Sequence, residues 1–153
     1  MDTNVLPATD VLVAGSQRGD DFKAVSVTVR ELDGHPLKAT LVAFGDPILE
    51  IGVWNESLWD AAEWSSEEEG MLFASILNII SDGSFPSGTS SLSFGQRRQL
   101  RDAMILEAHV KSGRDVFVTD DKRAFVNHGR RAALQQLCRT RICTSAEYIG
   151  GDY

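Results

Sequence analysis

Several features are scarce in this chain, and each scarcity excludes a class of protein. Only two of the 153 residues are cysteines, Cys138 and Cys143, so the chain is not a disulfide-stabilised secreted scaffold. No histidine or further cysteine near them has the spacing of zinc ligands. We therefore expect two buried, reduced thiols.

Long apolar runs are also missing. The longest, such as Met71 to Ile80, fall far short of the roughly 20 residues needed to cross a bilayer. Met1 is followed at once by Asp2, so no basic segment and apolar core of a secretory signal open the chain. These features predict a cytoplasmic protein that does not span a membrane.

An excess of positive charge is the third absence. The net charge is −7, which argues against binding nucleic acid through a basic surface that covers the whole molecule. Local basic patches exist nevertheless, and each is equally well explained as a solvated helix face. They comprise Arg97, Arg98 and Arg101, and Lys122, Arg123, Arg130 and Arg131.

The remaining composition is that of an ordinary globular protein. Hydrophobic residues make up 42% and charged residues 24%, with no fixed repeat and no tract of low complexity. A chain of this length suits one core, so we predict a single domain over residues 1–153.

The order of expected elements indicates an α/β protein with a central parallel sheet flanked by helices. Val25, Val27 and Val29 also alternate as a strand would, but the wider spacing from Phe22 favours a helix there. Capping patterns at Ser66 and at Ser93 with Gln96 mark two helix starts. The expected strands are 2–6 (a strand end that enters a loop up to residue 21), 48–54, 116–118 and 141–143, and the expected helices are 22–34, 55–63, 66–80, 93–112, 132–137 and 145–148.

Four acidic residues, Asp2, Glu56, Asp102 and Asp121, are predicted to lie at the carboxyl edge of this sheet. Each follows a predicted strand or lies on a helix facing the carboxyl edge of the sheet, where ligands of open α/β sheets bind. Carboxylate oxygens suit Mg²⁺ or Mn²⁺, and a divalent ion relieves the repulsion between them. Two such ions suffice to activate water against a phosphodiester.

Asp102 has the strongest individual case among these acids. It lies between apolar neighbours within a predicted helix, where an unpaired carboxylate is costly. An ion pair with a neighbouring arginine is the alternative explanation. Taken singly the acids prove little, because most of the 22 Asp and Glu residues belong on the surface.

Four segments contain these acids: DTNVL with Asp2 and Asn4, NESLWD with Glu56, RDAMILEAH with Asp102, and FVTDDKRAF with Thr119 and Asp121. Together they resemble the PIN-domain family of ribonucleases over nearly the whole chain. The resemblance implies metal ligands at Asp2, Asp102 and Asp121, and supporting roles for Asn4, Thr119 and Asp120. Glu50 and Asp60 are substitutes for Glu56, and Asp120 is a substitute for Asp121.

The resemblance also implies an activity and partners. The expected activity is cleavage of single-stranded RNA with Mg²⁺ or Mn²⁺, and the expected partners include an antitoxin protein or a second copy in a homodimer. The apolar strand that precedes the first motif in the family has no counterpart before Asp2. Either the start lies upstream of Met1, or Asp10 to Gly15 replaces the strand, or the site is loosened.

Two further classes compete with a nuclease. A PIN-like interaction module that has lost its metal site would keep the fold for partner binding. A receiver-type phosphate-transfer domain also gathers aspartates at strand ends, but the positions of the first aspartates and of the late lysine fit it poorly.

Overall fold

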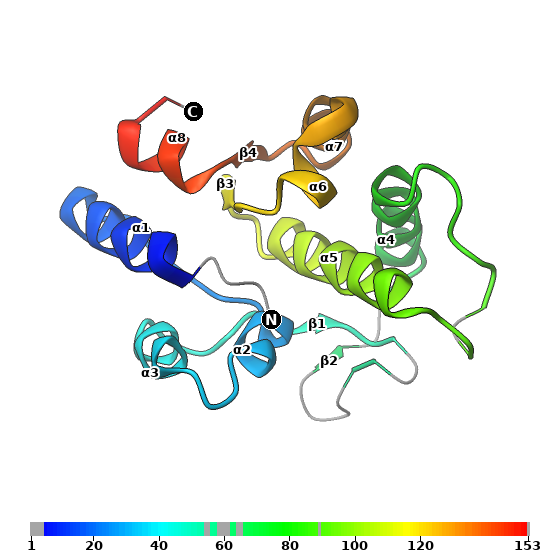
Figure 1. Cartoon of the computed structure of the whole chain (residues 1–153), viewed down its shortest axis with the longest axis horizontal. Coiled ribbons are helices and arrows are strands. Elements are labelled where there is room, and N and C mark those ends of the chain that lie inside the picture. The colour runs from blue at the N-terminus through cyan, green and yellow to red at the C-terminus, as the bar shows by residue number, and fades with distance from the viewer. Residues whose placement is uncertain (1–4, 54–55, 58–61, 64–65, 89, 153) are drawn as a thin grey trace.

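The structure is a computed structural model, and it describes residues 5–53, 56–57, 62–63, 66–88 and 90–152. Helices dominate it, and short parallel strands lie between them (Figure 1). The elements in chain order are α1 (Val5–Arg18), α2 (Ser26–Glu31), α3 (Pro36–Ala43), β1 (Glu50–Ile51), β2 (Ala62–Glu63), α4 (Glu67–Ile80), α5 (Phe94–Lys111), β3 (Val116–Val118), α6 (Lys122–Phe125), the 3-10 turn η1 (Asn127–Gly129), α7 (Arg130–Cys138), β4 (Arg141–Cys143) and α8 (Ser145–Gly150).

The strands form two separate parallel pairs. β1 pairs with β2 in the register Glu50 to Ala62, and β3 pairs with β4 in the register Val116 to Arg141. An isolated parallel bridge joins Val25 to Ile48 beside the first pair. The α/β class predicted from the sequence is confirmed, whereas the described residues do not form one central sheet.

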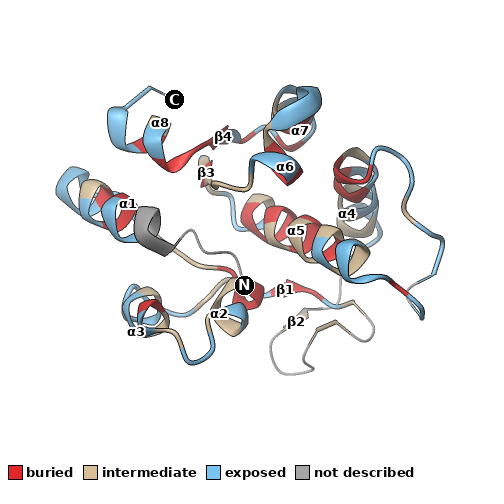
Figure 2. Ribbon diagram, viewed as in Figure 1, coloured by how far each residue is buried: buried red, intermediate tan, exposed pale blue. Residues whose placement is uncertain are grey.

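Helix α5 is the centre of the packing. It contacts α4 on one side and β1 and α2 on the other, and Figure 2 shows a buried face along it. Leu100, Met104 and Leu106 of this helix are almost completely buried. Around them pack Ile76 and Ile80 of α4, Leu134 of α7, Phe117 of β3 and Ile142 of β4. Residues far apart in sequence therefore meet on one helix.

Both helix starts predicted from capping patterns are confirmed. The Ser66 and Ser93 side chains accept hydrogen bonds from Glu69 N–H and Gln96 N–H, and both pairs form complete capping boxes. The end near Ser112 is confirmed too, because Gly113 follows in the left-handed conformation at φ 68°.

The amino-terminal prediction is wrong in the described part. Val5–Arg18 is a helix, so neither the expected strand end and loop nor a replacement strand from Asp10 to Gly15 forms there. Val11, Leu12 and Gly15 are buried on one face of this helix. That face packs against α8, which supplies the apolar partner that the sequence alone does not reveal.

Smaller corrections concern other element ends. The helix expected over 22–34 is limited to Ser26–Glu31, and Ala62–Glu63 is a strand where a helix was expected. Met71 of α4 is 66% exposed. Thr144 caps α8, because its side chain accepts a hydrogen bond from Glu147 N–H.

The structure also bears on the predictions about the cysteines and about membrane-spanning segments. Cys138 and Cys143 are free and buried, as predicted. Within the described ranges, every helix is too short or too polar to cross a bilayer.

Candidate functional site

A groove of about 820 Å³ separates β3 from the extended segment 22–25, and we call it the central groove. Asp102, Ile105 and His109 of α5 line it, spaced by three and four residues on one face of the helix. Residues 116–121 form a second wall, and residues 20–25 form a third. The groove therefore collects residues from both ends of the chain around α5.

The carboxyl end of β3 brings three of the predicted residues, Thr119, Asp120 and Asp121, to this groove. The Thr119 hydroxyl accepts a hydrogen bond from Asp121 N–H at 3.1 Å, which fixes the turn after the strand. Asp120 accepts bonds from Ser145 N–H at 3.0 Å and from the Ser145 hydroxyl at 2.5 Å. Strand β3 thus delivers two adjacent carboxylates, and Ser145 at the start of α8 holds one of them.

Asp121 has two partners of its own. Its Oδ1 accepts a hydrogen bond from Ala124 N–H at 2.9 Å, so it caps α6. Its Oδ2 lies 2.9 Å from the Arg98 guanidinium, and the Asp121 side chain is 14% exposed. Arg98, which belongs to the first basic patch of the sequence, therefore forms an ion pair with Asp121, one of the four predicted site acids.

Asp102 lines the same groove from the face of α5. It precedes Ile105 and His109 on that face, and Asp121 lines the groove from the segment 116–121. The structure therefore brings Asp102 and Asp121 to one cavity although 19 positions separate them in the sequence.

Glu56 occupies a different environment. Its side chain is 2% exposed and forms ion pairs with Arg97 and with Arg101, the latter at 3.2 Å. Within the described ranges it does not line the central groove. The arginines of the first basic patch therefore bind acids of the protein itself. Arg97 and Arg101 bind Glu56, and Arg98 binds Asp121.

The other predicted site residues divide into two groups. Asp2, Asn4 and the substitute Asp60 lie outside the described residues. Glu50, the other substitute, is fully buried, accepts a hydrogen bond from the Ser26 hydroxyl and lies 2.5 Å from the Arg30 guanidinium. Those contacts give Glu50 a structural role between α2 and β1.

The donor chemistry of the groove suits a hard divalent cation, because Asp102, Asp120 and Asp121 offer carboxylate oxygens. Among the residues that the structure describes, no three His, Cys, Asp or Glu side chains come close enough to hold a metal ion. Asp2, the third expected ligand, is outside that part of the chain. Asp102 and Asp121 are therefore the two described members of the expected set.

The groove also contains a cluster of residues that the sequence did not indicate. Tyr148 O–H donates to Asp20, Arg18 lies 3.1 Å from the same carboxylate, and these hydrogen bonds lower the pKa of Asp20. The Arg114 guanidinium bonds the Asp21 carboxylate at 2.9 Å. No local pattern predicts a partner of Asp20 that lies 128 positions away, so the sequence carried no signal for this cluster.

His109 is buried at the groove floor and lies 2.8 Å from the Thr140 hydroxyl through Nε2. Burial, with a smaller contribution from the Arg114 charge, lowers the pKa of His109 from 6.5 to about 4. The imidazole is therefore neutral at pH 7. His109 lines the groove from the same face of α5 as Asp102.

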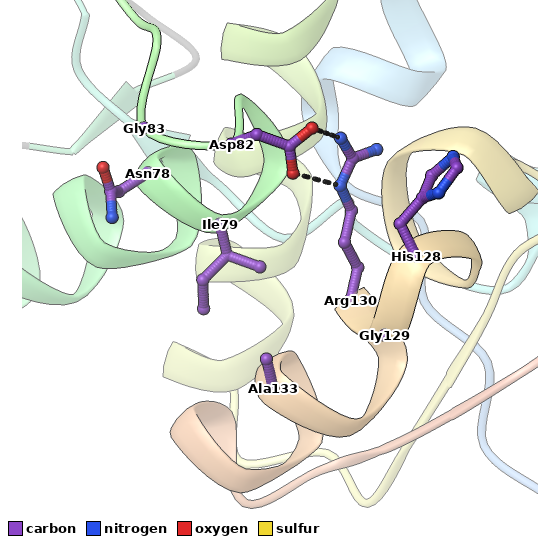
Figure 3. A pocket seen from close by; sticks show the side chains of 8 residues that line it. All are labelled: Asn78, Ile79, Asp82, Gly83, His128, Gly129, Arg130 and Ala133. Atoms are coloured by element: carbon purple, nitrogen blue, oxygen red, sulfur yellow. Dashed lines mark hydrogen bonds and ion pairs between the residues drawn. The ribbon is translucent and has the colours of Figure 1, made fainter.

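A second cavity of about 390 Å³ lies between the end of α4 and the start of α7 (Figure 3). Arg130 reaches across it to Asp82, with its Nη2 at 2.6 Å from Oδ2. The same guanidinium donates to the Arg123 carbonyl. Because Arg130 is already held by two groups, this cavity is best explained as a joint between α4 and α7.

Comparisons of the chain with protein-family models, with curated proteins and with solved structures found no match. The residues and their geometry therefore provide the evidence for function. Two observations bear on function: Asp102 and Asp121 share one groove, and Arg97 and Arg101 neutralise Glu56.

Proposed function

We propose that this protein is a metal-dependent ribonuclease of the PIN type that cleaves phosphodiester bonds in single-stranded RNA. One observation supports it above the others: Asp102 and Asp121 line the same groove at the carboxyl end of β3. The finer fold expected from the sequence, one central parallel sheet flanked by helices, is part of this proposal, although the described strands form two separate pairs.

Each described residue has a defined task in this proposal. Asp102 and Asp121, together with the expected third ligand Asp2, would hold Mg²⁺ or Mn²⁺, which would supply an activated water and stabilise the leaving oxygen. Thr119 positions the turn through its bond with Asp121 N–H. Arg98, whose side chain is 49% exposed, lies at the rim where it can bind a phosphate of the RNA.

Metal binding gives the first test, through thermal unfolding with and without millimolar Mn²⁺. A ligand that binds only the folded form raises the midpoint, with about 2.7 kcal/mol of stabilisation at a hundredfold excess over Kd. We expect this shift in the wild type and its loss in Asp102→Asn. Asp46→Asn, in an exposed turn outside the groove, is the matched control and keeps the shift.

Cleavage is tested on an end-labelled oligoribonucleotide. We expect cleavage with Mn²⁺, none with EDTA, and a rate at least about a hundredfold lower in Asp121→Asn, because a lost ligand removes several kcal/mol of transition-state stabilisation. An unshifted midpoint together with intact RNA would contradict the proposal.

An interaction module without catalysis is the second candidate, and a specific observation favours it. Arg97 and Arg101 bind Glu56, Arg98 binds Asp121, and Ser145 binds Asp120. Carboxylates with such partners are stable without a cation. If the protein is such a module, Mn²⁺ leaves the thermal midpoint of the wild type unchanged. The midpoint of Asp102→Asn is then also the same with and without Mn²⁺.

A further inference from the structure

The face of α5 that lines the central groove continues beyond it. Asp102, Ile105 and His109 of this helix line the groove. Residues four positions apart are neighbours in one oblique row on a helix surface, so Arg98 and Phe94 extend the row from Asp102 toward the start of α5. Neither Arg98 nor Phe94 lines the groove. The row therefore leads from a predicted metal ligand out to the amino-terminal end of the helix.

Phe94 lies at the outer end of this row. Its exposed fraction is 81%, the largest of any large apolar side chain that the structure describes, and Figure 2 shows this end of α5 as exposed. Gly95 follows without a side chain, and a Cβ added there meets nothing within 4 Å. A flat ring with open space beside it is accessible to a planar partner.

The backbone on both sides of Phe94 is fixed by the capping box of α5. Ser93 N–H donates to the Gln96 side chain at 2.8 Å, and Gln96 N–H donates to the Ser93 hydroxyl at 3.3 Å. The ring is therefore presented from an ordered helix start and not from a loose loop. A side chain presented in this way loses little conformational entropy when it binds a ligand.

A cationic side chain lies one helical turn away from the ring. The Arg98 side chain is 49% exposed, and its Nη2 lies 2.9 Å from Oδ2 of Asp121, which lines the groove. Arg98 thus stands between Phe94 and the predicted acids. A single exposed apolar residue needs no explanation, but an exposed ring in line with an exposed arginine is a combination that binds single-stranded nucleic acid. The ring stacks on a base and the cation contacts the phosphate backbone.

The spacing along the helix suits a polynucleotide strand. Eight positions separate Phe94 from Asp102, which is about 12 Å at 1.5 Å per residue. Stacked nucleotides of one strand are about 3.4 Å apart, and extended ones are farther apart, so about two to four nucleotides span this length.

We propose that Phe94 stacks on an unpaired base of the RNA, about two to four nucleotides from the phosphate held at Asp102 and Asp121, while Arg98 contacts the backbone between them. This contact rests on the proposed nuclease function and deepens it, because it specifies a substrate whose bases beside the cleavage site are unpaired. Bases of double-stranded RNA are held within the helix and cannot stack on the ring.

The test measures the Kd of a fluorescent RNA octamer of adenosine and cytidine by anisotropy, in EDTA so that the RNA stays intact. Phe94→Leu keeps an apolar side chain and removes the aromatic face, whereas Phe94→Trp enlarges that face. We expect Phe94→Leu to bind the octamer about tenfold more weakly than the wild type, and Phe94→Trp to bind it at least as tightly. Met71→Leu, at a 66% exposed position of α4, is the matched control and leaves the Kd unchanged.

An abasic octamer with the same sugar-phosphate backbone separates stacking from phosphate contact. It should bind the wild type and Phe94→Leu equally. Equal affinity of these two proteins for the intact octamer overturns the stacking contact, even where the Mn²⁺ shift and cleavage persist. An equal loss of affinity for the abasic octamer also overturns it, as does a wild type that binds no octamer or a dimer that Phe94→Leu dissociates. Octamer binding that depends on Phe94 without an Mn²⁺ shift or cleavage supports the contact and contradicts the nuclease.

Discussion

Individual carboxylates in this molecule differ in what neutralises them. Asp121 is shared between the α6 cap and Arg98, whereas Asp120 is bound by Ser145. Glu147 binds Arg131 and accepts a hydrogen bond from Thr144 N–H in the capping box of α8, and these hydrogen bonds lower its pKa from 4.5 to about 2. Asp102 and Asp121 were identified from the sequence because apolar neighbours and a strand end mark them, but their partners depend on contacts between distant segments.

His109 makes the stability of the fold dependent on pH. Its pKa falls to about 4 on folding, so between pH 6.5 and 4 the unfolded chain binds a proton that the folded chain does not. The free energy of unfolding therefore decreases as the pH falls through that window, by about 2 kcal/mol from pH 7 to pH 5. Urea denaturation at several pH values measures it.

His109→Gln is the control for this prediction. The variant lacks the titrating imidazole and should show a clearly smaller decrease over the same pH range. An unchanged slope would mean that other groups cause the loss of stability. The acids whose pKa values are lowered, including Glu147, act mainly below pH 4.5.

At the scale of the element, the helices with complete local signals were predicted well. Helices α4 and α5 begin with capping boxes and carry long apolar faces, and both formed as expected. Helix α1 was missed because Gly15 and polar residues interrupt its short apolar face. Its stability comes from Phe22 and from Tyr148 of α8, which pack against it.

Gly15 tests the seam between α1 and α8. An added Cβ would lie 2.0 Å from Phe22 Cζ and 2.7 Å from the Tyr148 hydroxyl. We expect Gly15→Ala to lower the free energy of unfolding by about 1 to 3 kcal/mol, despite the better helix propensity of alanine. Gly95→Ala in α5, which meets nothing within 4 Å, should stabilise the protein by up to about 1 kcal/mol. Thermal and urea unfolding measure both variants.

At the scale of the whole molecule, the main core connects the two strand pairs through α5. Cys138 belongs to that core and Cys143 to the smaller cluster with Val11 and Tyr148, and burial raises the pKa of each thiol to about 11. Both thiols are therefore protonated and shielded while the chain is folded.

Thiol reactivity should then report global unfolding. We expect a disulfide reagent at pH 8 to modify neither cysteine quickly in buffer and both at once above the urea midpoint. Fast modification of either thiol in buffer would show that the core opens locally. The rate of colour development, compared with the circular dichroism transition, distinguishes the two cases.

The sequence by itself determined the α/β class, the two capping boxes, strands β3 and β4, and the placement of Asp120 and Asp121 after β3, because each has a local signal in hydrogen-bonding or apolar spacing. Tertiary structure alone decided that Glu56 binds arginines of α5, that α1 is a helix, and that a groove lies between β3 and the segment 22–25. These features arise from contacts between segments far apart in the chain, where burial and ion pairing outweigh the preferences of short stretches.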